Sequence, residues 1–120
     1  MIKLMHTDLG TVYVEESALA KMAGNIATKC YGVVGMVFRS KRDGIVSLLK
    51  RDKMGKGIQV KMDGDGLSIA LHIMVEYGVN IGAISESIIK NVKYQMTEKT
   101  GLNVSDVMVH VESIRAQGVK

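Results

Sequence analysis

The longest regular pattern in the sequence runs from Leu67 to Val104, where a two-residue period gives way to a helical period. From Leu67 to Tyr77 every odd position is apolar or aromatic, while the even positions are small, polar or mixed. An alternation of this length, rich in β-branched residues, predicts a strand with one fully apolar face. Beyond Gly78 the apolar residues recur every three or four positions, which predicts a helix that packs on that face.

The two ends of this helix carry recognisable signals. Asn80 precedes the first helical position and can cap it through its side-chain oxygen. Gly101 suits the left-handed position that ends many helices, and Leu102 can fold back on the last turn. The apolar positions of the helix are Ile81, Ile84, Ile88, Val92 and Met96.

The N-terminal half predicts three further elements. Residues 9–14 read as a short strand, and the acidic pair Glu15 and Glu16 opens an alanine-rich helix that we expect to end near Gly32. Ile45, Leu48 and Leu49 have the spacing of a short amphipathic helix.

The C-terminal half adds two strands and a turn. Residues 58–63 alternate as a strand does, the sequence Asp63-Gly64-Asp65-Gly66 predicts a hairpin, and residues 104–114 form the last strand. The predicted fold is a single α+β domain spanning residues 1–120: a two-layer sandwich in which two main helices cover one face of a mixed four-stranded sheet. A ferredoxin-like strand order is one wiring that fits.

Composition fits a globular protein without a membrane helix. Hydrophobic residues make up 47% and charged residues 23% of the chain, and no apolar run approaches the length of a spanning helix. The N-terminus turns polar too soon for a signal peptide. A single cysteine excludes an internal disulfide and fits a reducing compartment. We therefore expect a cytoplasmic protein.

Positive charge concentrates between residues 39 and 61, where eight basic residues meet few acidic ones. Such a segment suits an anionic lipid, a phosphorylated ligand or an acidic protein; the alternative is a solvated loop without a partner. Nucleic acid is not expected, because no aromatic cluster lies among the lysines. The candidate anion or lipid surface consists of Lys50, Arg51, Lys53 and Lys56.

Two histidines and two glutamates project from the even faces of two predicted strands. If those strands were neighbours, His72, Glu76, His110 and Glu112 would gather on one surface, as a metal site requires. Methionines on the same surface favour a contact with another copy instead, and we expect neither a metal nor a cofactor. The candidate self-association face consists of Ala70, His72, Met74, Met108 and His110.

Other motifs predict no catalysis. Cys30 lies on the apolar side of the first helix without a histidine near it in sequence, so a packed thiol explains it better than a nucleophile. The Asp-Gly-Asp-Gly stretch resembles the start of a calcium loop, but the required twelfth-position glutamate would be Met74. We expect no catalytic residues.

Three stretches taken together resemble the alkaline shock protein family, small cytoplasmic proteins of Gram-positive bacteria linked to general stress and cell-envelope homeostasis. They are residues 32–36 after an alanine-rich helix, Val75-Glu76-Tyr77-Gly78-Val79-Asn80-Ile81, and residues 100–104 leading into the last strand. The similarity covers Gly10 to Ile114 and is closest to the minimal-domain subset.

The resemblance implies a non-catalytic protein that associates with itself and with partners. Some family members are held at the inner face of the membrane by a membrane-anchored protein, and a subset is encoded beside a fatty acid kinase-like protein. We therefore expect a homo-oligomeric scaffold or adaptor in stress or envelope physiology. Direct binding of anionic lipid or a phosphorylated ligand through residues 39–61 is the alternative.

Overall fold

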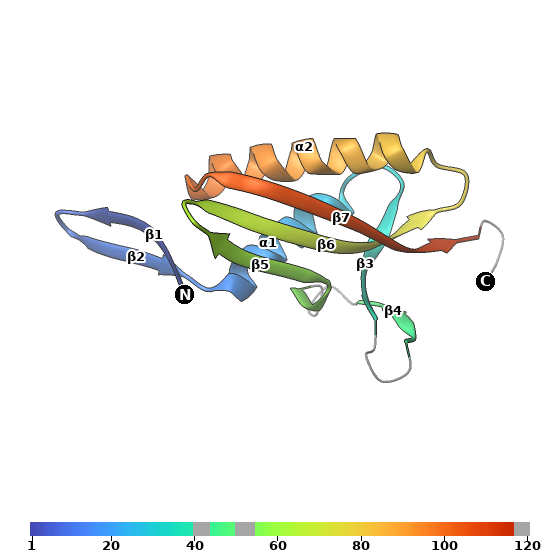
Figure 1. Ribbon diagram of the computed structural model, residues 1–120, viewed down its shortest axis with the longest axis horizontal. Coiled ribbons are helices and arrows are strands. Elements are labelled where there is room, and N and C mark those ends of the chain that lie inside the picture. The colour runs from blue at the N-terminus through green and yellow to red at the C-terminus, as the bar shows by residue number, and fades with distance from the viewer. Residues whose placement is uncertain (40–43, 50–54, 117–120) are drawn as a thin grey trace.

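The computed structural model describes residues 1–39, 44–49 and 55–116, and within them a mixed sheet carries two helices on one face (Figure 1). The elements in chain order are β1 (Ile2–Thr7), β2 (Gly10–Val14), α1 (Glu16–Thr28), β3 (Val33–Arg39), β4 (Val46–Leu48), β5 (Ile58–Asp63), β6 (Gly66–Glu76), α2 (Ile81–Thr100) and β7 (Val104–Arg115).

Strand β6 is the centre of the main sheet. Along one side it pairs in parallel with β7, from Leu67 opposite Val104 to Glu76 opposite Arg115. Its other side is shared, because antiparallel β5 occupies the first half and antiparallel β3 the second. Strand β4 extends the sheet beyond β3. The connection from β6 to the parallel β7 is α2, the long crossover that a parallel pair requires.

The α+β class, the mixed sheet and the two helices on one face are confirmed, but the main sheet has five strands where four are predicted. Strands β3 and β4 are not among the predicted strands, and the predicted strand at residues 9–14 lies outside this sheet. Because residues 46–48 form β4, the short helix predicted from Ile45, Leu48 and Leu49 is wrong. The three residues of β4 pair with β3, and the amide of Leu49 donates to the carbonyl of Met36 at 2.9 Å. These hydrogen bonds make the segment a strand. The apolar spacing of so few residues fits a strand as well as a helix, so the spacing alone does not decide between them.

The signals around β6 and α2 have their predicted structure. The side-chain oxygen of Asn80 accepts a hydrogen bond from the amide of Ala83 at 3.0 Å. Gly101 has φ 73°, and its amide donates to the carbonyl of Thr97 at 2.9 Å. The hairpin between β5 and β6 closes with Asp63 opposite Gly66.

The core lies between the inner face of the sheet and the two helices. Leu67, Leu71 and Ile73 on β6 have no exposed surface, and neither do Ile88, Val92 and Met96 on α2. Helix α1 ends at Thr28, before the predicted Gly32, which lies in the following turn with φ 85°. A Cβ at Gly32 would stand 2.3 Å from Cδ1 of Ile84, so this glycine lets the turn approach α2.

Strands β1 and β2 form a hairpin that projects from the body, which we call the arm (Figure 1). The predicted strand at residues 9–14 is therefore paired outside the main sheet. The radius of gyration is 15.2 Å, against about 13.6 Å for a compact chain of this length. Ile2 at the root of the arm is buried, whereas Leu9 at the tip is fully exposed.

The arm is tied to α1 at its root by an ion pair. The N-terminal amine of Met1 lies 2.8 Å from a carboxylate oxygen of Glu16. The hydrogen bond between the two groups, together with the attraction of their opposite charges, raises the pKa of the amine and lowers the pKa of the Glu16 carboxyl.

Candidate interaction surfaces

The even-numbered residues of β6 and their neighbours on β7 form the outer face of the sheet, opposite the helices. The parallel register sets Ala70 beside Met108 and His72 beside His110. Met74 follows on β6, between Gly35 of β3 and Ser113 of β7. The structure thus places all five residues of the predicted self-association face on one surface. No helix of the described chain packs on it, since α1 and α2 lie together on the other side (Figure 1).

Exposure varies across this outer face. Met108 is 45% exposed and His110 is also exposed, whereas Ala70 retains only 5% of its surface because its larger neighbours cover it. His72 and Met74 are partly buried. The accessible part of the surface therefore lies toward β7.

The two histidines stack on each other. Their ring centroids are 4.6 Å apart and their planes differ by 9°. Nδ1 of His72 lies 2.8 Å from Oε2 of Glu112, and both side chains are mostly shielded from solvent. Glu76 lies elsewhere, in an ion pair with Arg115 at the end of the strands.

This arrangement brings together three of the four residues considered for a metal site. Parallel stacked rings direct their nitrogens side by side and do not converge on one ion, and His72 already uses one nitrogen on Glu112. In the described ranges no group of three or more His, Cys, Asp or Glu is arranged to hold a metal ion. The cluster is better suited to hydrogen bonding across a surface.

One residue of the predicted anion or lipid surface, Lys56, lies within the described part of the chain. Lys50, Arg51 and Lys53 lie outside the described residues. Lys56 is exposed, in a single helical turn immediately before β5. The structure therefore bears on one of the four predicted residues, and it leaves the side chain of that residue accessible to a ligand from solvent.

Cys30 is half-buried between the end of α1 and α2. Its thiol donates to the carbonyl of Ile26 at 3.6 Å, and the amide nitrogen of Asn91 lies 3.7 Å from the sulfur. Among the described residues these are its polar contacts, and neither partner is a base that could activate a nucleophile.

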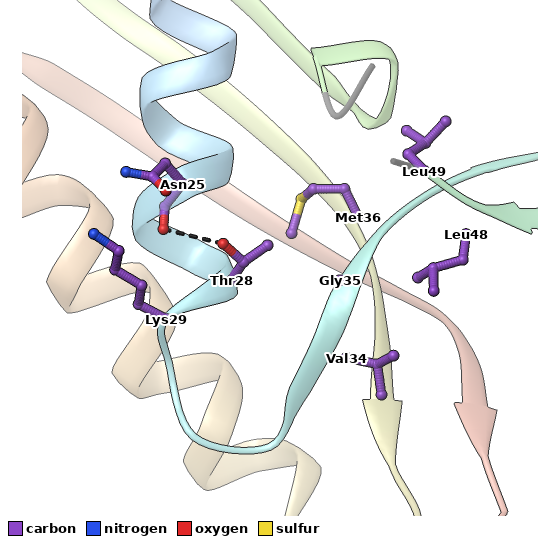
Figure 2. Close-up of a pocket in the computed structure, with 8 residues that line it drawn as sticks. All are labelled: Asn25, Thr28, Lys29, Val34, Gly35, Met36, Leu48 and Leu49. Carbon is purple, nitrogen blue, oxygen red and sulfur yellow. Dashed lines mark hydrogen bonds between the residues drawn. The ribbon is translucent and has the colours of Figure 1, made fainter. Parts of the chain in front are cut away.

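A hollow of about 350 Å³ opens between the end of α1 and strands β3 and β4 (Figure 2). Polar residues of α1 form one wall, where the hydroxyl of Thr28 donates to the carbonyl of Asn25 at 3.1 Å. Met36, Leu48 and Leu49 form the opposite, apolar wall, and Lys29 supplies the only charge among the described residues of the lining. This lining pairs no acid with a base, so it offers no general acid–base chemistry.

A second hollow, of about 480 Å³, lies where the turn after α1 meets the corner between β6 and α2. The amide of Glu76 donates to the carbonyl of Gly32 at 2.9 Å and holds the two segments together. Sequence patterns do not reveal this meeting, because the two segments lie far apart in the chain. The lining residues are Tyr31, Gly32, Glu76, Tyr77, Gly78, Val79 and Asn80.

The described part of the chain contains no helix that is both long enough and apolar enough to cross a membrane. Helix α2 has sufficient length but is polar over most of its surface.

Comparison of the sequence with known proteins gives a consistent result. A model of the alkaline shock protein family, described as having a cell envelope-related function, matches residues 4–116. A protein named uncharacterized protein YloU, from Bacillus subtilis (strain 168), is 30% identical over 112 residues, which cover 92% of this chain and 93% of the relative. Uncharacterized protein Spy1614 of Streptococcus pyogenes serotype M6 is 32% identical over 115 residues, 95% of each chain.

Comparison with solved structures bears on the fold alone. A structure of a MamM variant superposes with a TM-score of 0.50 and 13% sequence identity, covering 88% of this chain and all of that chain. Two helices on one face of a mixed sheet are therefore an arrangement also found in a solved structure.

Proposed function

The chain belongs to the alkaline shock protein family, which has a cell envelope-related function, and from this premise we propose that it is a non-enzymatic protein that associates with copies of itself. The observation that carries the proposal is the outer face of the sheet. This face presents Met108, Met74 and the His72–His110 pair, while the described helices pack only on the other face.

The chemistry of this face supports contact with protein. Methionine side chains adapt to irregular apolar surfaces, and imidazoles offer hydrogen bonds at low conformational cost. Burial of apolar area stabilises an interface by about 25 cal/mol per Å², from which the entropy of association must be subtracted. Within the described residues, neither the two hollows nor Cys30 adds a set of groups that would perform a reaction.

Sedimentation velocity at high micromolar concentration tests the proposal. We expect the wild-type chain to associate, and Met108→Asp or Met74→Asp to shift it toward monomer, because each substitution sets a charge on the contact face. Tyr94→Asp is the matched control: it also sets a charge at an exposed apolar position, 67% accessible, but on α2. A wild-type chain that stays monomeric at these concentrations would refute the proposal.

The partner class is a further part of the proposal. The family resemblance supports a membrane-anchored protein or a fatty acid kinase-like protein as the partner beyond the chain itself. A pull-down from native cells with wild-type protein and with Met108→Asp as control would identify partners that need the outer face. Recovery of the same proteins with both baits would place their binding elsewhere.

Anion or lipid binding by the basic segment remains a separate prediction. Lys56→Glu should lower binding to vesicles containing anionic lipid, and the loss should be largest at low salt because exposed charges are screened at high salt. Vesicle co-sedimentation across a salt series measures this effect, with Lys99→Glu, another exposed lysine, as the control. Equal binding to neutral vesicles would contradict it.

A further inference from the structure

Strand β7 forms an edge of the main sheet and is its longest strand. It pairs with β6 on one side, and within the described residues no strand pairs with the other side. An edge of twelve residues presents a row of unpaired amides and carbonyls, which is a template for adding another strand. Asp106, Met108 and His110 line the outer face of this edge and are all exposed.

We infer that a second copy of the chain adds its β7 to this edge, antiparallel to the first, with Met108 at the two-fold axis. This inference rests on the self-association proposed above and assigns the contact to the β7 edge of the outer face, where Met108 and His110 lie. The two sheets would become one continuous sheet, and the outer faces of the two copies would join.

The register follows from the order of side chains along β7. With Met108 opposite Met108 of the second copy, Asp106 lies opposite His110 on both sides of the axis. A carboxylate then faces an imidazole that can donate a hydrogen bond, twice in one interface. Such self-complementarity is what a two-fold interface requires, and it favours a second copy over an unrelated strand.

The two neighbouring registers give less favourable cross-strand pairs of side chains. Centring the pair on Val109 sets Asp106 opposite Glu112, so two carboxylates face each other across the strands. Centring it on Val107 sets Asp106 opposite Met108, which leaves the carboxylate beside an apolar side chain. Both shifts keep the inner and outer faces aligned, so only the cross-strand pairs distinguish them.

The histidine cluster fits the same register. His72 has a carboxylate partner in its own chain, Glu112 at 2.8 Å, whereas the contact that the described structure gives His110 is the stacking on His72. In the paired sheet Asp106 of the second copy would lie on the side of His110 that faces away from His72. Each of the two stacked imidazoles would then have a carboxylate partner.

Irregularities in β7 limit the length of the pairing. The register with β6 shifts near Ser105 and again near Glu112, so the regular part of the strand is residues 106–111. A short ladder of this kind supports reversible association.

Cysteine cross-linking tests the register directly. In a Cys30→Ser background, Met108→Cys would bring two cysteines opposite each other, at Cα separations of about 4.5–5.5 Å that a disulfide spans in either ladder phase. We expect a covalent dimer under mild oxidation. Asp106→Cys is the matched control, because in this register its two copies stand about 14 Å apart and cannot bridge.

Charge exchange provides a second measurement without cysteines. Asp106→Lys removes both complementary pairs, and we expect it to raise the dimer dissociation constant about tenfold. Adding His110→Asp to the same chain restores opposite charges across the axis and should recover most of the affinity. Sedimentation equilibrium measures all three proteins.

The outcomes separate this inference from the proposed function. If the wild-type chain associates but Met108→Cys does not cross-link, or Asp106→Cys cross-links equally well, the register is refuted and self-association stands. Failure of the charge exchange to restore affinity would also refute the register. A wild-type chain that remains monomeric would refute both.

Discussion

The two faces of β6 belong to one strand, but they differ in how far they are buried and in what they contact. On the inner face, Leu71 and Ile73 are fully buried by the two helices, and hydrophobic burial explains their identity. On the outer face, His72 and Met74 alternate with them and keep part of their surface accessible. The same strand therefore stabilises the domain through its inner face and leaves its outer face available for contact with another protein chain.

The largest expected effect comes from truncating the inner face. Ile73→Ala should lower the free energy of unfolding by about 2–5 kcal/mol, because it removes buried methyl groups and leaves a cavity under the helices. Met74→Ala, its neighbour on the outer face, should cost less than about 1.5 kcal/mol. Urea denaturation of both variants measures the contrast, and equal losses would contradict it.

A second prediction concerns the close approach of the turn at Gly32 to α2. Gly32→Ala should cost about 1–3 kcal/mol, because the residue has φ 85° and the new Cβ would meet Ile84 at 2.3 Å. Gly64→Ala is the control, since Gly64 also has positive φ, 65°, but nothing lies within 4 Å of its Cβ position. The difference between the two variants isolates the contact with α2, and no difference would show that only backbone strain matters.

A smaller effect is expected at the start of the helix that covers the inner face. Asn80→Ala should cost about 1 kcal/mol, because the amide of Ala83 loses its side-chain partner. Asn80→Ser keeps a capping oxygen and should retain most of the stability. Thermal unfolding followed by circular dichroism compares the variants. If serine is as destabilising as alanine, the hydrogen bond is not the cause.

The smallest effect on stability is expected on the outer face. Glu112→Gln keeps the shape of the side chain and weakens the contact with His72, so the free energy of unfolding should change by less than about 1 kcal/mol. Denaturation measures the stability, and the histidine ring resonances in NMR report whether the stacked pair moves. A loss as large as that of Ile73→Ala would mean that the outer face also stabilises the fold.

The inner face of β6, the β5–β6 turn and both ends of α2 are predictable from sequence because each depends on local signals. Alternation over β6, the glycines of the β5–β6 turn and the cap at Asn80 act within a few residues of each other. The neighbours of β6 are set by contacts far along the chain, so the adjacency of His72 and His110 depends on the parallel pairing across α2.

Two of the strands that the sequence does not predict, β4 and β1, are missed for local physical reasons. Strand β4 has only three residues, and over that length apolar spacing does not separate a strand from a helical turn. Strand β1 escapes prediction because its register with β2 shifts between Lys3 and Met5, which disturbs the alternation that marks a strand. The candidate surface is likewise predictable as a set of residues on even positions, but not as a stacked cluster.

The parallel pairing of β6 with β7 ties the middle of the chain to its last strand. During synthesis on the ribosome, the apolar face of β6 therefore stays partly exposed to solvent until α2 and β7 have emerged. Such a nascent chain is a natural client for a chaperone, and truncation anywhere before β7 should yield a fragment that aggregates instead of a smaller folded unit.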